Sequence, residues 1–261
     1  MAKISNYVKQ SVPYLILVAI TTPIVLMYSM LFLGSVSRSL YGLVPTEIKF
    51  ENWQFVLTGY IQAPGTGTVE AGRYPNIYLV TFNTFLLALA VGGLEVFMTS
   101  LAGYAISRYK FKGRNAFLTL TLILHGFPSI TLLIAIFYIL RVTGLFDTLL
   151  GVILVKTALE LPLGIWIMKG FFDGIPWDVE MSALVDGCTR LQAWWKVIMP
   201  NVKPGISSVM IFAFLSGWSE FMFILVFIVS NINWTLSMLV KAMIGEWRFV
   251  DYGMLAAVSI Y

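Results

Sequence analysis

The strongest constraint on the fold of this chain is a series of apolar runs, each about as long as a lipid bilayer is thick. A helix rises about 1.5 Å per residue, so about 20 apolar residues cross the hydrocarbon core. Five runs reach this length, at about Val12–Leu33, Ile77–Ser107, Ala116–Leu140, Leu149–Met168 and Gly205–Val229. The sequence therefore predicts an all-α integral membrane protein, with a single transmembrane domain over residues 1–261.

Composition agrees with this interpretation and excludes several classes of function. Only 11% of the residues are charged, whereas a soluble domain carries about 25%. The net charge of +4 comes from basic residues scattered through short loops, which indicates control of membrane topology rather than nucleic-acid binding. A single cysteine, Cys188, and a single histidine, His125, exclude a disulfide framework and a Cys- or His-rich metal site. We expect no catalytic residue and no metal ligand in this chain.

A sixth apolar run begins at Gly253, but the sequence stops at Tyr261. These nine residues cover about 14 Å, which is about half of a hydrocarbon core. We therefore expect that the natural protein continues and completes a sixth span. No small-residue cleavage site follows the first run, so we expect a retained span rather than a removed signal.

The basic residues of the short loops predict the orientation of the chain. Residues 108–114 (RYKFKGR) hold four basic residues and no acidic one, which is typical of a cytoplasmic loop. Counting spans from this loop places the N-terminus and residues 169–203 in the cytoplasm. The same count places residues 34–76, 141–147 and 231–251 outside.

The external loop 34–76 contains one amphipathic pattern. Phe50, Trp53 and Leu57 recur at helical spacing, which indicates a short helix at the membrane surface. Such a helix would lie on the bilayer or contact an external partner protein.

The polar residues between the fourth and fifth runs predict two short helices joined by a glycine. The first helix would begin at Asp178 as its N-cap, with Glu180 in the first turn, where a negative charge is favourable. Its small residues Ser182 and Ala183 would let another protein surface approach closely. Gly187 would end it, because glycine readily adopts the left-handed conformation found at helix C-termini.

Thr189 and Gln192 form a capping box, which predicts the start of the second helix. This helix would end at Pro200 and present one apolar stripe, comprising Leu191, Trp194, Trp195 and Ile198. We refer to residues 176–200 as the elbow, and we expect the elbow on the cytoplasmic side of the membrane.

The elbow resembles the EAA signature of binding-protein-dependent ABC importer permeases. In that family a Glu-Ala-Ala triplet is followed by a glycine, then by nine residues and an Ile-x-Leu-Pro ending. Here Gly187 is followed by nine residues and by Val197–Pro200 (VIMP). The triplet reads Met-Ser-Ala from Met181, so a methionine replaces the family glutamate. Glu180 lies one residue earlier, about 100° around the helix.

Further motifs, in matching order, resemble the sugar-importing branch of that family, typified by the shorter permease of the maltose transporter. They are Asn83-Thr84, residues 104–114, Pro128, Leu161-Pro162, Gly170–Phe172, Ile175-Pro176 and residues 218–221 (WSEF), where the branch usually has Trp-Asn-Glu-Phe. The resemblance covers most of the chain.

This resemblance implies a six-span ABC importer permease fold that forms half of the translocation path of an ATP-driven sugar importer in a prokaryotic cell membrane. The elbow would be the coupling helix that docks on a cytoplasmic ATPase, through Glu180, Met181, Ser182, Ala183, Asp186, Gly187 and Pro200. The implied partners are a second homologous permease subunit, two ATPase subunits, an extracytoplasmic sugar-binding protein and membrane lipid. ATP and Mg would bind the ATPase and no cofactor would bind this chain, which contains no GxxxxGK phosphate loop.

Four polar residues inside the runs are candidates for the translocation path: Asn83, Trp218, Ser219 and Glu220. A charged side chain inside a span costs about 2.5–3.5 kcal/mol on insertion scales, so Glu220 requires a partner or a function. Either these residues contact sugar hydroxyls or gate the channel, or they bond neighbouring helices.

Other charges leave a different class of transporter open. Lys156 and Glu160 are four residues apart, so they would pair on one helix face. A secondary transporter driven by an ion gradient would instead use Lys156, Glu160 and Glu220 as coupling charges, and would not need the elbow. The roles of Glu95 and His125 stay open. An intramembrane enzyme is disfavoured, because the chain has one histidine and no HExxH motif.

Overall fold

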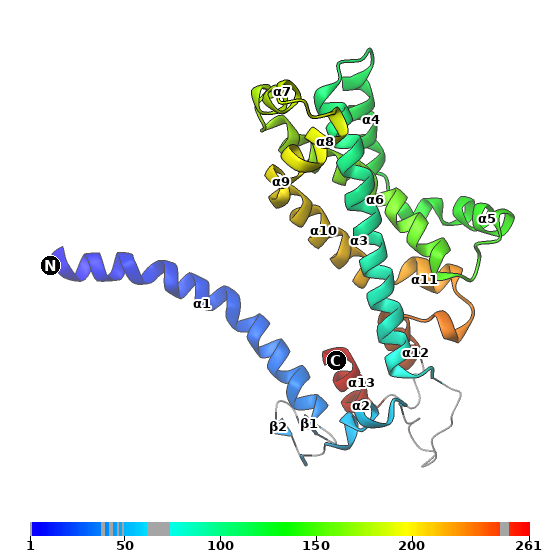
Figure 1. Cartoon of the computed structure of the whole chain (residues 1–261). Coiled ribbons are helices and arrows are strands. Elements are labelled where there is room, and N and C mark those ends of the chain that lie inside the picture. Colours follow the sequence, from blue (N-terminus) through cyan, green and yellow to red (C-terminus); the bar gives the residue numbers. More distant parts are fainter. Residues whose placement is uncertain are drawn as a thin grey trace. The chain divides into compact units, whose positions relative to one another are not determined.

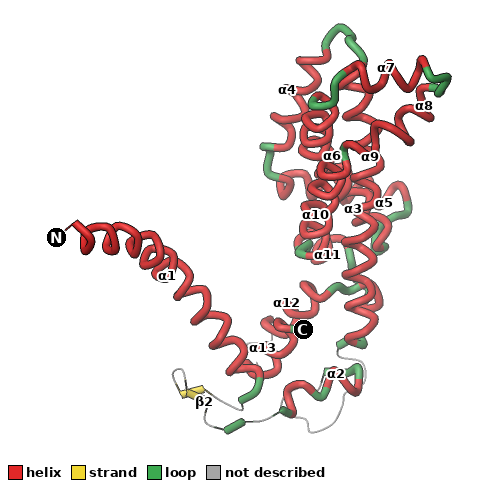
Figure 2. The backbone as a smooth tube through the Cα atoms, turned by 60° about the vertical axis from the view of Figure 1, so that its left-hand side comes forward, coloured by secondary structure: helices red, strands yellow, loops and turns green. Residues whose placement is uncertain are grey.

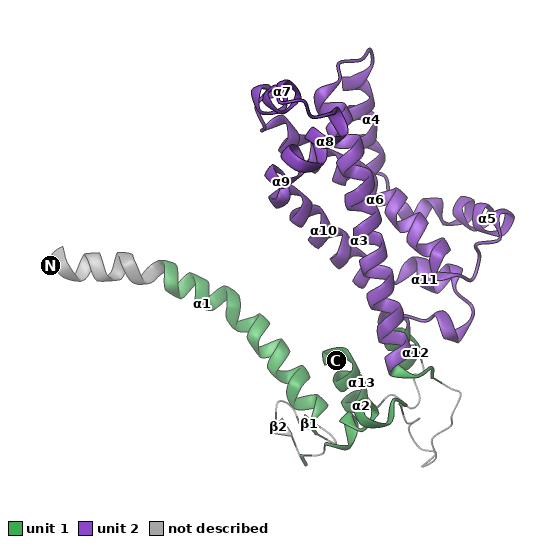
Figure 3. Ribbon diagram, viewed as in Figure 1, with its two compact units in different colours: residues 1–77, 239–261 green, residues 78–238 purple. Residues whose placement is uncertain are grey.

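The computed structural model describes residues 2–37, 40–41, 44–45, 47–48, 50–61, 74–245 and 251–261. The chain divides into two compact units (Figure 3): the first comprises residues 1–77 and 239–261, and the second comprises residues 78–238. Helices account for nearly all of the described residues (Figure 2), which confirms the predicted all-α class.

The first unit is built on a long N-terminal helix, α1 (Ala2–Ser35). Every side chain from Pro13 to Met30 is exposed and most are apolar, so this stretch requires lipid or another protein around it. Helix α1 packs against α13 (Tyr252–Ile260). The other elements of the unit are short: the antiparallel strands β1 (Leu40–Tyr41) and β2 (Val44–Pro45), the 3₁₀-helix η1 (Glu51–Trp53) and α2 (Phe55–Thr58).

The predicted amphipathic helix around Trp53 is replaced by two short helical turns, η1 and α2. Helix α2 ends at Gly59, whose φ of 78° is left-handed. Phe50 and Leu57 are exposed, whereas Phe55, which lay outside the predicted apolar stripe, is buried. Phe50 and Leu57 are thus uncovered within the described chain, and their contact with a bilayer or a partner protein stays a prediction.

The second unit holds three long helices, α3 (Ile77–Arg108), α6 (Leu149–Asp173) and α10 (Lys203–Trp218) (Figure 1). The shorter elements are α4 (Arg114–His125), η2 (Ser129–Leu132), α5 (Leu133–Thr143), α7 (Trp177–Val185), α8 (Arg190–Ala193), η3 (Trp194–Ile198), α9 (Met199–Asn201), α11 (Met222–Phe227) and η4 (Asn231–Asn233). Helix α12 (Leu236–Gly245) begins at the end of this unit.

Helices α3, α6 and α10 approach one another closely at glycines. A Cβ on Gly217 of α10 would lie 2.9 Å from Ala88 Cα of α3, and a Cβ on Gly103 of α3 would lie 2.9 Å from Met168 Cβ of α6. Close contact between small residues is the usual way in which membrane helices pack. Two apolar clusters fill the space around these contacts; their buried members include Leu87, Val91, Ala213 and Phe223 in one, and Met168, Phe172, Ile198 and Val209 in the other.

Three of the described helices are long and apolar enough to cross a membrane, namely Pro13–Ser35, Ile77–Arg108 and Leu149–Asp173. Two helix pairs also qualify if each is taken as one bent span. They are Arg114–His125 with Ser129–Thr143, bent by 90°, and Arg190–Asn201 with Lys203–Trp218, bent by 75°.

The third and fifth predicted runs thus differ from the prediction, because neither is a single straight helix. In the third run the chain turns at Gly126–Pro128, since a proline disfavours the helical conformation of the residue before it. In the fifth run α10 ends at Trp218, and the chain leaves the helix at Ser219–Phe221. The Glu220 carboxylate then accepts a hydrogen bond from the Phe223 amide and so supports the start of α11.

Candidate functional site

The elbow has the predicted glycine turn, but its first helix begins earlier than predicted. Helix α7 starts at Trp177 with Pro176 as N-cap, so Asp178 lies in the first turn and is not the N-cap. Gly187 ends the turn after α7 with a φ of 88°, and no atom outside its neighbours lies within 4 Å of the position where a Cβ would be. The glycine is therefore required by the backbone conformation and not by packing.

The capping box at the start of the second elbow helix is confirmed. The Gln192 amide donates to Thr189 Oγ1 over 3.3 Å, and the Thr189 amide donates to Gln192 Oε1 over 2.9 Å. The helix does not end at Pro200, as predicted, but at Asn201. Pro200 lies at the second position of α9, directly after the π-helical turn that ends at Ile198.

A π-helical turn, η3 (Trp194–Ile198), interrupts the second elbow helix and was not predicted. Trp194 and Ile198 are buried, whereas Leu191 and Trp195 are 71% and 65% exposed. The predicted single stripe was therefore wrong. The wider turn contains one residue more than an α-helical turn, and so directs the four side chains to two faces.

Glu180 is directed into the protein, away from the exposed surface of the elbow. Its Oε2 lies 3.0 Å from Arg108 Nε, with side-chain exposures of 0% for Glu180 and 4% for Arg108. Its Oε1 accepts a hydrogen bond of 2.7 Å from the Tyr104 hydroxyl. Arg108 also donates from Nη2 to the Ile175 carbonyl over 3.1 Å, and its guanidinium lies 5.3 Å from the centre of the Trp177 ring. We call these residues the α3–elbow cluster.

The exposed surface of the elbow consists of other residues of the predicted set. Met181, Ser182, Asp186, Gly187 and Pro200 are exposed, whereas Ala183 is buried. Apolar side chains without cover within the described chain lie beside them, namely Val185, Leu191 and Trp195. Such a surface fits a docking partner better than water.

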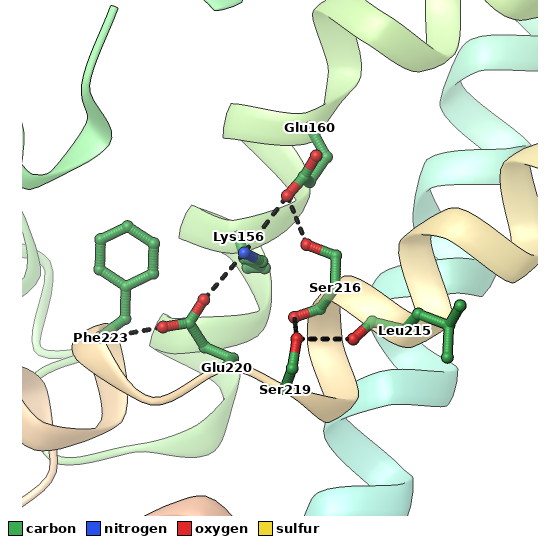
Figure 4. Close-up of polar contacts among 7 residues, drawn as sticks. All are labelled: Lys156, Glu160, Leu215, Ser216, Ser219, Glu220 and Phe223. Carbon is green, nitrogen blue, oxygen red and sulfur yellow. Dashed lines mark hydrogen bonds and ion pairs between the residues drawn. The ribbon is translucent and has the colours of Figure 1, made fainter. Parts of the chain in front are cut away.

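A second group of charges lies between α6, α10 and the break after α10, and Figure 4 shows its contacts. Lys156 Nζ lies 3.2 Å from Glu160 Oε1, the predicted pair, and 2.8 Å from Glu220 Oε2. The Ser216 hydroxyl donates to Glu160 Oε1 over 2.5 Å. The second oxygen of Glu220 accepts from the Phe223 amide over 2.9 Å. We call Lys156, Glu160, Ser216 and Glu220 the membrane polar cluster.

The membrane polar cluster borders a cavity of about 270 Å³, whose lining includes Lys156, Ser216, Ser219, Glu220 and Ser129. Of the four residues predicted for the translocation path, Ser219 and Glu220 therefore lie together. Trp218 does not line this cavity, and its ring stacks on Phe214 at 5.8 Å. The hydroxyls of Ser216 and Ser219 also donate within the protein, to Glu160 and to the Leu215 carbonyl, so toward the cavity their oxygens serve as hydrogen-bond acceptors.

Asn83, the fourth predicted residue, lies away from this cavity. Its side-chain amide donates to the carbonyls of Ile232 and Trp234, over 2.7 and 3.0 Å. The neighbouring Thr84 hydroxyl accepts from the Leu236 amide over 2.9 Å. We call these contacts the α3–loop cluster; they bond a helix to a loop, whereas the sequence indicated either a sugar contact or a bond to a neighbouring helix.

Asp147, in the loop between α5 and α6, forms a further junction that the sequence did not predict. Its carboxylate accepts from the amides of Val229 and Ser230 and from the Ser230 hydroxyl, and its carbonyl accepts from Asn233. Burial raises the pKa of the Asp147 carboxyl, but these hydrogen bonds outweigh burial and hold the pKa below its usual value. The φ of 60° at Asp147 places this residue in the left-handed region, which aspartate tolerates better than most residues.

Sequence reasoning missed Tyr104 and Arg108 as functional candidates. In the sequence, Arg108 serves as a marker of orientation and both residues belong to the 104–114 motif, without a role for either side chain. The available signal was their spacing of four residues at the end of a span, which places both side chains on one helix face. The partner, Glu180, is 72 residues further along the chain, so no local pattern could identify the pair.

Known proteins resemble this chain in sequence and in fold. A family model described as "binding-protein-dependent transport system inner membrane component" matches residues 95–261, which contain both the elbow and the membrane polar cluster. A sulfoquinovosyl glycerol transport system permease protein of Agrobacterium fabrum is 36% identical over 194 residues, which are 74% of this chain and 68% of that protein. A trehalose transport system permease protein of Mycobacterium tuberculosis is 32% identical over 178 residues, 68% of this chain and 60% of that protein. This chain thus spans about two thirds of the length of these relatives.

A solved structure has a similar fold. It is the crystal structure of a bacterial ABC transporter involved in the import of the acidic polysaccharide alginate, with a TM-score of 0.76 and 18% identity. The match covers 99% of this chain and 91% of that chain.

Proposed function

Because the chain belongs to the family of binding-protein-dependent transport system inner membrane components, we propose that it is a permease subunit of an ATP-driven sugar importer. In this role it forms half of the translocation path, beside a second homologous permease subunit. Two ATPase subunits, which bind ATP and Mg, and an extracytoplasmic sugar-binding protein complete the importer. The N-terminus and the elbow face the cytoplasm, in line with the basic residues of the 108–114 loop.

The observation that carries this proposal is the elbow, an exposed turn with its fixed glycine. Met181, Val185, Leu191 and Trp195 present apolar side chains around Gly187. These residues form the contact with the ATPase in our proposal. Glu180 supports that contact from behind, because it is fully buried and paired with Arg108. The ATPase closes on ATP, displaces the elbow and so changes the accessibility of the path.

The proposed cargo is a carbohydrate. The two relatives above are named for sulfoquinovosyl glycerol and trehalose, which are both sugar compounds. The cavity beside the membrane polar cluster offers the hydroxyls of Ser216 and Ser219, and a sugar hydroxyl can donate to such groups. Lys156, Glu160 and Glu220 neutralise one another in part, so they hold the path together and are not its principal sugar ligands.

The ion-coupled alternative is disfavoured by family membership and by these same contacts. Coupling charges must exchange partners with a transported ion. Here Lys156 contacts both Glu160 and Glu220, and Glu220 also accepts the Phe223 amide. These contacts hold the three charges in one arrangement, as expected of a structural network.

Reconstitution in vesicles tests the proposed function. We expect that vesicles with this chain, its partner permease, the ATPase and the loaded binding protein take up sugar only with ATP. Gly187→Val should abolish uptake and leave ATP hydrolysis, since a β-branched residue disfavours the left-handed turn.

Gly113→Val is the matched control, because Gly113 also has a left-handed φ, of 90°, and open space around it. It lies outside the elbow and should leave uptake close to that of the wild type. Normal uptake by the Gly187→Val variant would contradict the role of the elbow. Uptake by this chain alone on a sodium or proton gradient would support the secondary transporter.

A further inference from the structure

Helix α3 differs from the two other long helices of its unit in continuity. It runs for 32 residues without a proline, which corresponds to about 48 Å, and Figure 1 shows it as one unbroken helix. Helix α6 contains Pro162, and α10 ends at the break before Glu220. A helix with an intact hydrogen-bond ladder resists bending better than one with a proline or a break.

One end of α3 is bonded to the elbow. Tyr104 and Arg108 lie one turn apart on the same helix face, and both contact the Glu180 carboxylate. Arg108 also contacts the Ile175 carbonyl and the Trp177 ring. The ion pair is almost completely buried, so little water is present to weaken it. Displacement of α7 must therefore either displace α3 or break several buried contacts.

The other end of α3 is bonded to the segment 231–236. Asn83 and Thr84 are 5% and 0% exposed, and their side chains bond the backbone at Ile232, Trp234 and Leu236. These bonds satisfy two carbonyls and one amide of the segment's backbone, and leaving such groups unpaired when buried is costly. They fix the loop to α3 at a point that lies about 38 Å along the helix from Arg108.

We propose that α3 is the rigid link that transmits displacement of the elbow to residues 231–236. Tyr104 and Arg108 are its positioning residues at the elbow end, and Asn83 and Thr84 are those at the loop end. The inference rests on the proposed function, in which the elbow is moved by an ATPase. The inference adds the route by which movement of the elbow reaches residues 231–236, at the external end of α3.

A double-mutant cycle in the reconstituted importer tests this route. The elbow end is disconnected by Arg108→Met together with Glu180→Leu, which removes both charges and leaves neither unpaired. The loop end is disconnected by Asn83→Leu. The readout is sugar taken up per ATP hydrolysed, which loss of assembly alone would not change in the surviving complexes.

We expect each disconnection to lower uptake per ATP by about 5- to 150-fold, the usual range for coupling between two sites. The combination of both should lower uptake no further than the stronger one alone, because a link in series is already interrupted. Two independent defects so far apart would instead multiply. A product of the two losses, or no loss from either, would overturn the proposal.

Two controls separate this route from its alternatives. Ser107→Ala removes a hydrogen bond to Asp173 of α6 at the same end of α3 and should leave uptake per ATP unchanged. Asp147→Asn loosens the junction that ties the α5–α6 loop to residues 229–233. Each of Asp147→Asn and Asn83→Leu is combined with Arg108→Met and Glu180→Leu. If Asp147→Asn causes no further loss of uptake per ATP in this combination and Asn83→Leu does, then α6 carries the displacement and the proposal is wrong.

Hydrogen exchange tests the rigid link without any transport activity, so its outcome does not depend on the proposed function. Wild-type vesicles that show no ATP-dependent uptake would reject the proposed function. In the full chain in detergent, neutralising Arg108 and Glu180 should still speed exchange of the Leu236 amide, which is bonded to Thr84. Unchanged exchange at Leu236 would reject the rigid link, whatever the chain transports.

Discussion

Two buried ion pairs in the second unit look alike in composition and differ in surroundings. Arg108 and Glu180 are 4% and 0% exposed and are enclosed by the rings of Tyr104 and Trp177. Lys156 and Glu220 are 14% and 7% exposed and border a cavity. The volume of that cavity, about 270 Å³, is enough for several water molecules. The difference indicates that the exposed fraction of a charged side chain does not by itself set how much stability is lost when its partner is removed. Access of water to the remaining charge also decides this loss.

The largest effect should follow from removing one charge of the α3–elbow cluster. Glu180→Leu leaves Arg108 buried without a carboxylate, and we expect the free energy of unfolding in detergent to fall by about 3–5 kcal/mol. The double variant Arg108→Met with Glu180→Leu should recover most of this loss. A double variant as unstable as the single one would show that the two residues do not act as a pair.

Removing Lys156 should have a smaller effect, although two carboxylates then lose their partner. Water from the cavity can solvate Glu220, and Glu160 is 21% exposed, so we expect Lys156→Met to lower the free energy of unfolding by about 1–3 kcal/mol. The same unfolding measurement compares the two clusters directly. A loss equal to that of Glu180→Leu would remove the distinction between them.

Glu220→Gln sharpens the comparison within the membrane polar cluster. The glutamine oxygen can still accept from the Phe223 amide, but the glutamine NH2 group then faces Lys156, so the ion pair and its hydrogen bond are lost. We expect a loss of about 0.5–1.5 kcal/mol. Glu220→Ala, which removes the contact to α11 as well, should be worse; equal losses would mean that the contact to Phe223 contributes nothing.

The smallest effect concerns Asp147, which is hydrogen-bonded and unpaired with a cation in the contacts described above. Its folded-state pKa is lowered, so its contribution to stability is complete above the unfolded value of about 3.9 and is lost as the pH falls through the folded value. Unfolding temperatures between pH 6 and pH 3 should therefore fall less steeply for Asp147→Asn than for the wild type. Identical pH profiles would contradict the assignment.

The sequence was sufficient wherever the determining contacts are local. Gly187 and the Thr189–Gln192 capping box depend on a few neighbouring residues, and the Lys156–Glu160 pair depends only on helical spacing. The long apolar runs and the EAA-like spacing were sufficient for the fold class and the family. These features share a physical reason, which is that backbone geometry alone brings the residues together.

The remaining features depend on contacts between distant segments. Glu180 was expected on the docking surface, but Arg108 and Tyr104 of α3 bond it from the other side. Asn83 was grouped with Ser219 and Glu220, but it bonds the segment around Ile232. The break after α10 was not predicted, because hydropathy along residues 205–229 does not register a change of direction.

The π-helical turn at Trp194–Ile198 lies largely within the nine-residue interval between Gly187 and Val197, so the length of this interval affects how the helix is built. A π turn contains one residue more than an α turn, so it acts as a one-residue insertion within a continuous helix. Deleting one residue there would restore an ordinary helix and rotate everything on one side of the deletion by about 100°. Trp195 would then move from solvent into the buried position that Trp194 occupies, and Trp194 would be forced into the fully buried position of Ala193. Insertions and deletions in this short stretch should therefore be tolerated far less than substitutions on its outer face.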